Sequence, residues 1–291
     1  MASYFTNYCK DRILNYYFVP SNSFTQNPAS GTPGTYAALL KTSTPPDHAG
    51  NYLEIANLDR EAITFGAVSS ASLATTTAEI LFDTTNVTST HTVGYVGIFE
   101  DTAATTPNLL AWATLDGGNI TVDSSQNVKI ATGDLKAGIS VNADSSITDS
   151  QRALVDAVAQ EAVDMTFKYG TGTIQNANTS GYTLELALFS SNSYSSANPV
   201  QTEFSGANYS RQAITFGAAA AGSGTERVVS NTNSISFQNM NSSDSPAEKW
   251  GVYAVSGGTS VLLALNDHST QAFATGSDIT FAPGDIKITL D

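Results

Sequence analysis

Short runs of alternating apolar and polar residues, separated by clusters of Gly, Ser, Asn, Asp and Pro, make up most of the chain. Alternation with a period of two places every second side chain on the same face of a strand, and the clusters supply the residues that turns require. The pattern predicts short strands at residues 36–42, 61–65, 78–82, 94–99, 109–115, 119–122, 128–130 and 135–141, and again at 183–189, 212–216, 234–237, 250–255, 261–265, 278–281 and 286–290.

A helix-like pattern precedes each series of strands. The first extends from a capping residue at Thr6 to Pro20, with apolar residues at helical spacing between them. The second begins with a cap at Thr148 or Asp149 and ends before Gly170. We expect the apolar stripe of each helix to pack on its own domain, with an exposed docking face as the alternative.

The sequence also repeats itself. Residues 56–67 return as residues 207–218 with nine of twelve positions identical. Gly-Asp-Leu-Lys at residues 133–136 returns as Gly-Asp-Ile-Lys at residues 284–287, with the same offset of 151 residues. Two matches at one offset predict a tandem duplication. Other segments align with offsets that drift by a few residues, as insertions in surface loops would cause.

Together these features predict a mainly β fold of two tandem domains, residues 1–145 and 146–291. Each domain is expected to be a β-sandwich, either immunoglobulin-like or jelly-roll-like, preceded by a short α-helix. A parallel α/β fold does not fit, because the helical patterns do not alternate with the strands.

The repeated segments define a structural motif. In the shared strand, Ile and Phe alternate with small residues, which predicts that they face the core, and a Gly ends the strand. The Gly-Asp pair predicts the turn that precedes the last strand. The two arginines have two interpretations, an ion pair with a carboxylate such as the Asp of the second segment, which would join two strand ends, or a solvated charge at a strand edge. The motif residues are Arg60, Ile63, Phe65, Gly66 and Asp134 in the first copy, and Arg211, Ile214, Phe216, Gly217 and Asp285 in the second.

Composition and charge narrow the partners. Hydrophobic residues make up 41% of the chain, which is enough to fill a core although charged residues make up only 13%. The formal net charge of -14 predicts repulsion from nucleic acid and from anionic membranes. Cys9 is the only cysteine, which excludes an intrachain disulfide and a Cys-based metal site. Neither an export signal nor a membrane-spanning run is visible, so we expect synthesis and folding in a cytoplasm.

Candidate residues for chemistry are few. The three histidines, His48, His91 and His268, do not occupy equivalent positions in the two copies, and no nucleophile signature lies near them. Residues 142–146 alternate oxygen-bearing side chains but lack the Gly and distal Glu of a calcium loop. We therefore expect no catalytic, cofactor-binding or metal-binding residues, no cofactor and no enzyme activity. Paired carboxylates for sugar cleavage stay open, because their spacing depends on the fold.

The stretch Tyr-Ser-Arg-Gln-Ala-Ile-Thr-Phe-Gly at residues 209–217 resembles a motif of small bacteriophage virion proteins that are often labelled tail-fibre or minor structural proteins. In that family, a helix beginning Thr-Asn-Tyr precedes the motif, and a Gly-Ile-Phe or Trp-Gly strand and a Gly-Asp closing strand follow it. The resemblance covers both copies. Copy one departs from it at Leu58, where the family has Tyr, and copy two lacks the Thr-Asn-Tyr opening, so whether both copies keep the same contacts is open at this point.

The resemblance implies a non-enzymatic structural protein located in the virion and made in the bacterial host. Within that class the leading expectation is a head decoration or cement-like accessory protein, since a duplicated scaffold can span neighbouring subunits of a lattice. The alternative is a tail or tail-fibre component for host adsorption. A particle-bound polysaccharide-degrading enzyme and a free carbohydrate-binding module are the competing classes. The expected partners are major capsid or tail proteins, with self-association as a further possibility, and neither nucleic acid nor membrane.

Overall fold

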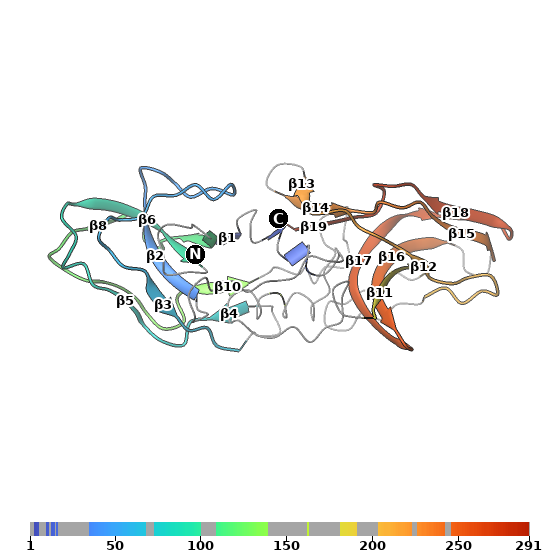
Figure 1. Ribbon diagram of the computed structural model, residues 1–291, viewed down its shortest axis with the longest axis horizontal. Helices are drawn as coiled ribbons and strands as arrows, with labels where there is room; N and C mark the ends of the chain where they lie inside the picture. The colour runs from blue at the N-terminus through green and yellow to red at the C-terminus, as the bar shows by residue number, and fades with distance from the viewer. Residues whose placement is uncertain are drawn as a thin grey trace. The chain divides into compact units, whose positions relative to one another are not determined.

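The computed structural model describes residues 3–5, 10–11, 13–14, 16, 35–67, 73–99, 109–138, 162, 181–190, 203–222, 226–241 and 246–290. The chain forms two compact units, each built mainly from antiparallel strands (Figure 1). Unit 1 consists of Met1–Lys10, Thr25–Ile139 and Gln160–Gly172. Unit 2 consists of Asp11–Phe24, Ser140–Ala159 and Thr173–Asp291.

Unit 1, blue to green in Figure 1, has a main sheet in the order β1-β7-β6-β2-β3, and β8 also pairs with β6. Two further strand pairs, β4 with β10 and β5 with β9, complete the described strands of the unit. The strands are β1 (Ser3–Phe5), β2 (Thr35–Lys41), β3 (Glu61–Ile63), β4 (Leu73–Thr75), β5 (Ile80–Phe82), β6 (His91–Phe99), β7 (Leu109–Thr114), β8 (Ile120–Val122), β9 (Val128–Ile130) and β10 (Lys136–Gly138).

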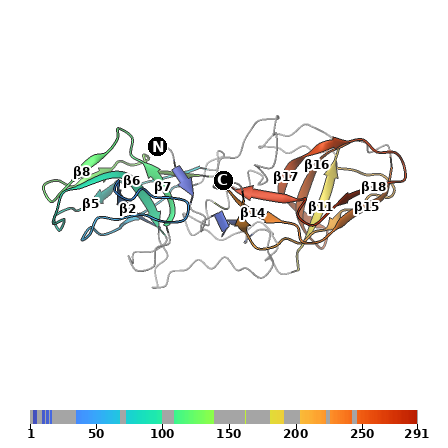
Figure 2. The same cartoon turned by 90° about the horizontal axis from the view of Figure 1, so that it is seen from above.

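Unit 2, yellow to red, repeats this plan with a main sheet in the order β12-β11-β16-β17 (Figure 2). Its other described strands form a sheet β13-β14-β19 and a pair β15-β18. The strands are β11 (Thr183–Phe189), β12 (Gln212–Ala213), β13 (Ala220–Ala221), β14 (Arg227–Ser230), β15 (Ile235–Met240), β16 (Ala247–Ser256), β17 (Thr259–Gln271), β18 (Ser277–Phe281) and β19 (Lys287–Leu290).

Strand register identifies equivalent positions in the two main sheets. Gly97 on β6 lies opposite Ala38, and Gly251 on β16 lies opposite Ala187. Neither glycine has room for a side chain, because a Cβ at Gly97 would lie 2.6 Å from the Phe99 ring and one at Gly251 would lie 2.9 Å from a neighbouring phenylalanine ring. The same steric requirement therefore applies at the same register in both sheets, although the ring comes from the glycine's own strand β6 in unit 1 and from the neighbouring strand β11 in unit 2.

The shared motif strand passes from one sheet to the other. Its first residues pair with the main sheet, as β3 with β2 and as β12 with β11. Two residues past β3, Phe65 bridges to Thr76, and the equivalent Phe216 bridges to Asn231. The strand therefore ends beside β4 of the β4-β10 pair in unit 1 and beside β14 of the β13-β14-β19 sheet in unit 2. Ile63 and Phe65 are buried while the residues between and before them are exposed, which matches the predicted alternation.

The predicted fold class, a mainly β chain of two tandem β-rich units, is confirmed. Helical conformation is present at Lys10, Asp11, Ile13, Leu14 and Tyr16 and at Ala162, while the other predicted helical positions lie outside the described residues. The domain boundary near residue 145 also lies outside them and stays a prediction.

Several strands differ from the sequence prediction. Strand β17 extends well beyond the predicted residues 261–265. The prediction missed its second half, with the sequence Asn-Asp-His-Ser-Thr-Gln, because this half is polar and carries no apolar alternation. Strands β1, β4, β13 and β14 were not predicted at all. They are short, and pairing with a neighbouring strand determines them more than their own composition does.

We predict that Gly251→Ala destabilises unit 2 by about 1 to 3 kcal/mol, because the added methyl group overpacks the core against aromatic and leucine side chains. Gly217→Ala is the matched control, since a Cβ there would meet its nearest atom at an ordinary 3.4 Å. Urea unfolding followed by the fluorescence of Trp250 in unit 2 measures both variants. Equal losses of stability in the two variants would contradict the steric explanation.

Candidate functional site

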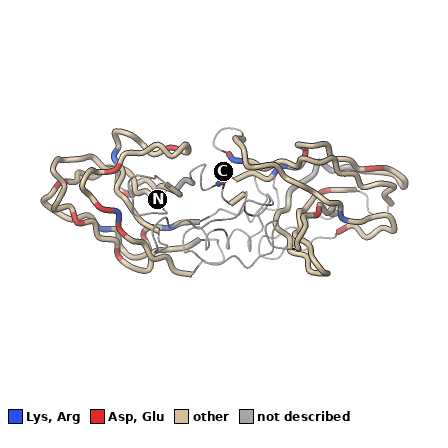
Figure 3. Tube along the Cα trace, viewed as in Figure 1, with Lys and Arg blue, Asp and Glu red and all other residues tan. Residues whose placement is uncertain are grey.

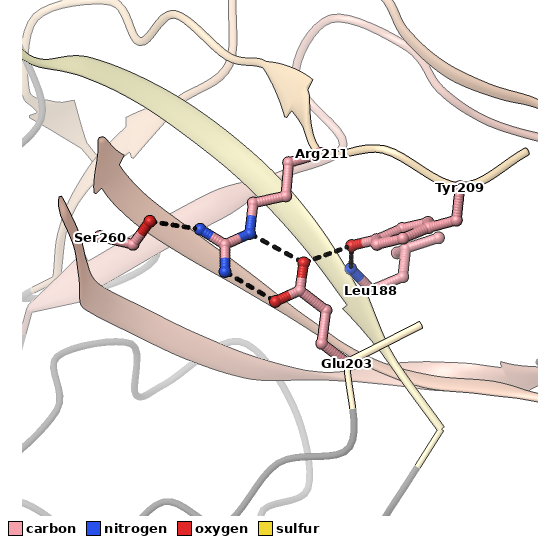
Figure 4. Close-up of polar contacts among 5 residues, drawn as sticks. All are labelled: Leu188, Glu203, Tyr209, Arg211 and Ser260. Atoms are coloured by element: carbon pink, nitrogen blue, oxygen red, sulfur yellow. Dashed lines mark hydrogen bonds and ion pairs between the residues drawn. The ribbon is translucent and has the colours of Figure 1, made fainter. Parts of the chain in front are cut away.

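A cluster of polar contacts surrounds Arg211 in unit 2 (Figure 4). Arg211 Nε donates to Glu203 Oε1 at 2.8 Å and Nη2 donates to Oε2 at 2.7 Å, which is a bidentate ion pair. The remaining Nη1 donates to Ser260 Oγ at 2.9 Å. The guanidinium also stacks 3.7 Å from the ring centroid of Tyr253. Arginine is suited to this position because its planar fork can pair with a carboxylate and stack on a ring at once.

Tyr209 joins this cluster to the sheet. Its hydroxyl donates to Glu203 Oε1 and accepts the backbone N–H of Leu188, both at 3.0 Å. Its ring stacks on Phe237 with a centroid distance of 5.8 Å and an interplanar angle of 6°. Burial raises the pKa of Tyr209 far above its usual value, and the hydrogen bond of Arg211 to Glu203 raises the pKa of the guanidinium. The phenol and the guanidinium therefore keep their protons at any physiological pH.

Unit 1 contains the same cluster around Arg60. Arg60 donates to Glu54 through Nε at 3.1 Å and Nη2 at 2.7 Å, and it stacks 3.7 Å from the ring centroid of Phe99. Phe99 lies opposite Tyr36 in register and packs in a buried cluster with Leu40 and Trp112. Both arginines therefore use a carboxylate and an aromatic ring.

The tyrosine of the two clusters comes from different places in the chain. Leu58 occupies the position of Tyr209, and Tyr52 supplies the phenol in unit 1 instead. The Tyr52 ring meets Phe99 edge-on at 5.1 Å, and its hydroxyl lies 3.5 Å from Arg60 Nη2. Burial, followed by the charge of Glu54, raises the pKa of Tyr52.

Each ion pair fastens a loop to the main sheet. Glu54 forms a β-bridge with Leu40 of β2, and Glu203 forms one with Phe189 of β11. Arg60 follows Glu54 by six residues, and Arg211 follows Glu203 by eight. Each ion pair therefore joins the two ends of the loop that leads into the motif strand.

Each arginine forms an ion pair with a carboxylate, as one of the two interpretations expected, but the partners are Glu54 and Glu203 rather than Asp134 and Asp285. The Arg60 side chain is only 2% exposed, so it is not a solvated charge. The partner glutamates were missed because no shared neighbouring residues mark them in the sequence.

The Gly-Asp segments form the predicted turns, and a buried polar residue holds each one. Gly133 and Gly284 have φ angles of +83° and +89°, which favour glycine. The Gly284 N–H donates to the carbonyl and the side-chain Oδ1 of Asn231, and the Ile286 N–H donates to the same Oδ1 at 2.8 Å. In unit 1 the Gly133 N–H donates to the carbonyl and Oγ1 of Thr76.

Thr76 and Asn231 are also the residues to which Phe65 and Phe216 bridge. Each is 2% exposed, so one buried residue connects the end of the crossing strand to the Gly-Asp turn. The sequence could not reveal this link because Thr and Asn share only an oxygen acceptor. Asp285 turns its carboxylate inward to its own turn, where Oδ2 accepts the Ala282 N–H at 2.6 Å.

The candidate residues for chemistry do not converge. His48 Nδ1 lies 3.5 Å from Lys10 Nζ, and its ring meets Trp112 edge-on at 5.0 Å. His91 Nε2 lies 3.1 Å from the Ser89 hydroxyl. The His268 side chain and residues 142–146 lie outside the described part of the chain.

The described residues contain neither a metal-binding cluster nor a membrane-spanning helix. No three or more His, Cys, Asp or Glu side chains gather there in a way that could hold a metal ion. No described helix is long and apolar enough to cross a membrane. Charged residues are scattered along the described trace rather than gathered in one block (Figure 3).

The two units are therefore tandem β-rich structures in which the repeated arginines pair with glutamates and the Gly-Asp turns are held by Thr76 and Asn231. This places the chain among structural proteins of bacteriophage fibres, because the model of one family, described as podophage GP4 fiber I protein gp80, matches residues 4–138 and again residues 153–289. The chain belongs to this family, with two copies in tandem. No curated protein and no solved structure matches it.

We predict that Arg60→Ala destabilises unit 1 by about 3 kcal/mol, since it leaves Glu54 without its partner in a largely buried site. Arg211→Ala should cost only about 1 kcal/mol in unit 2, because the Arg211 side chain is 22% exposed. Trp112 and Trp250, the two tryptophans, report the two units separately when each is replaced by Phe in turn. Lys129→Ala, which breaks an exposed pair, is the control and should change neither transition. A larger loss for Arg211→Ala than for Arg60→Ala would refute this account.

We also predict that Asn231→Ala destabilises unit 2 by about 3 kcal/mol, because it leaves the buried N–H of Ile286 without its acceptor, whereas the Gly284 N–H keeps the backbone carbonyl of residue 231. Asn208→Ala is the control, since Asn208 makes one exposed hydrogen bond, to the Asn239 carbonyl. Amide hydrogen exchange should show faster exchange at Ile286 in Asn231→Ala alone. Unchanged protection at this amide would show that the side chain does not hold the turn.

Proposed function

We propose that this protein is a non-enzymatic structural component of a phage tail fibre, which binds other virion proteins and contributes to host adsorption. The observation that carries the proposal is the match of both repeats to a family of phage fibre proteins. The family description favours the fibre over head decoration, which the tandem duplication alone had suggested. The virion is accordingly the proposed location.

The use of the polar residues within the described units supports a structural role. In the Arg–Glu–aromatic clusters the charged groups pair with each other, and the buried Thr76 and Asn231 side chains bind turn amides. Such arrangements fix strand connections without leaving an activated nucleophile or base. A stable scaffold with exposed, variable loops is what a fibre component requires.

The acidic balance of the chain bears on its partners. With a formal net charge of -14, the protein repels polyanions and associates best with virion proteins that present basic or neutral surfaces. Major capsid and tail proteins therefore remain the proposed partner class, and self-association between fibre subunits is consistent with it.

Cryo-electron microscopy of the phage carrying a C-terminal tag on this protein, labelled with a tag-specific antibody fragment, tests the location. We expect label on the tail fibres, and untagged phage provides the background. Label distributed over the capsid would favour head decoration instead, and absence of label from purified infectious particles would overturn the structural assignment.

A second measurement separates a fibre role from enzyme activity. Phage that lack the protein should adsorb to the host more slowly, while the purified protein should release no reducing sugar from host surface polysaccharide. Sugar release would replace the structural proposal with a depolymerase. Normal adsorption without the protein would remove host attachment from its role.

A further inference from the structure

A row of directly opposed residues crosses the main sheet of each unit beneath the arginine. Residues that oppose each other on antiparallel strands lie on the same side of the sheet. The row consists of Tyr36, Phe99 and Leu109 in unit 1, and of Glu185, Tyr253 and Leu262 in unit 2. Both rows therefore lie on the sheet face that the arginine covers.

A β-bulge at the same place in both sheets makes Phe99 and Tyr253 equivalent. The register shifts immediately before Phe99 in unit 1 and immediately before Tyr253 in unit 2. The shift leaves Leu110 and Leu263 without an opposed residue on β6 and β16. Because a bulge sets the direction of the side chains beside it, the two rows can be compared position by position.

The row is buried in unit 1 and reaches the surface in unit 2. Phe99 and Leu109 are 0% and 2% exposed. Tyr253 and Leu262, at the equivalent positions, are only partly buried. The arginines follow the same trend, with side chains 22% exposed in unit 2 and 2% exposed in unit 1. The face is therefore open to a ligand in unit 2 and closed in unit 1.

Two of the three positions are more polar in unit 2. Glu185 stands where unit 1 has Tyr36, and Tyr253 stands where it has Phe99. Among the residues that the structure describes, neither the Glu185 carboxylate nor the Tyr253 hydroxyl takes part in a hydrogen bond or an ion pair. These two groups can therefore bind a ligand without breaking a contact that holds the fold.

The neighbouring cluster adds hydrogen-bonding groups (Figure 4). Arg211 Nη1 donates to Ser260 Oγ at 2.9 Å, which leaves the Ser260 O–H to donate elsewhere. Each Nη of the guanidinium also carries a second N–H. Burial, followed by the charge of Glu203, raises the pKa of Tyr253, so the phenol keeps its proton at physiological pH. The face thus presents O–H and N–H donors beside a carboxylate acceptor.

We propose that this face of unit 2 binds a neutral saccharide through Glu185, Tyr253, Arg211 and Ser260. The hydroxyls of a sugar ring donate to a carboxylate and accept from O–H and N–H groups at once, and its C–H face packs on an apolar side chain, here Leu262. The inference goes beyond the proposed function, which names no binding residue, and a location in the fibre does not depend on it.

Charge makes an uncharged ligand the best fit. The guanidinium of Arg211 is already compensated by Glu203, so the carboxylate of Glu185 sets the sign of the face. The chain as a whole carries a formal charge of -14. Both charges repel acidic sugars, whereas a neutral sugar meets no such cost.

Saturation-transfer NMR on the full chain tests for binding. The probes are the methyl glycosides of glucose, galactose, mannose, rhamnose and N-acetylglucosamine, with methyl glucuronide as the acidic counterpart. We expect transfer to at least one neutral glycoside and weaker transfer to the glucuronide. Transfer to none of the neutral glycosides, or stronger transfer to the glucuronide, would overturn the proposal even if the protein is located in the tail fibre.

Two conservative variants test the residues. Tyr253→Phe and Glu185→Gln should each weaken the affinity for the bound glycoside roughly tenfold, because each removes a hydrogen-bonding group. Tyr253→Phe should fold normally, since unit 1 has Phe99 at the equivalent position, and the urea midpoint of Trp250 fluorescence checks this. Ser236→Ala, which removes an exposed hydroxyl on β15, is the control and should bind as the unchanged chain does. Equal affinities in all of these proteins would contradict the assignment.

Backbone amide chemical shifts give an independent readout of the position. Titration with the bound glycoside should move amide signals of β11, β16 and β17 around Glu185 and Tyr253. The equivalent amides of β2, β6 and β7 should not move, because Phe99 and Leu109 are buried there. Shifts confined to other strands would show that the sugar binds elsewhere and would overturn the proposed site.

Discussion

The structure of each unit depends on a strand that must leave one sheet and join the other within a few residues. The motif strand begins on the main sheet and ends at Phe65 or Phe216, which bridge to the residue after β4 in unit 1 and after β14 in unit 2. A chain that changes sheets loses the ladder on one side before it gains the other, so its ends need additional attachment. The arginine cluster secures the beginning of this strand, and the buried Thr76 or Asn231 secures its end.

The two copies meet this requirement with different residues. Phe99 and Tyr253 both lie beneath an arginine, and Tyr52 and Tyr209 reach the same kind of ion pair from different positions. In both clusters an aromatic ring lies under the guanidinium and a phenol hydroxyl lies beside the ion pair, and in both turns a side-chain oxygen accepts the glycine N–H. Divergence after duplication has therefore changed residue identity while keeping the interaction.

The functional assignment rests on the family match, together with the use of polar residues for contacts that hold strands and turns. The polar clusters of the two copies hold strands and turns, and the chain belongs to a family of phage fibre proteins, for which a duplicated scaffold is useful. Head decoration was the leading expectation from the sequence, because duplication suits a lattice. A tandem scaffold suits a fibre equally well, and sequence pattern alone cannot distinguish the two assemblies.

The sequence by itself determined the β class, the duplication, the inward alternation of the motif strand and the Gly-Asp turns, because all four depend on local periodicity, self-similarity or backbone preference. Only the tertiary structure decided that Arg60 pairs with Glu54, that Asn231 holds the Gly284 turn and that Asp11 reaches Arg227. These contacts join residues whose proximity is set by strand register and sheet order. Neither is encoded in the pattern of a single segment, so the partners of the motif could not be identified from the motif itself.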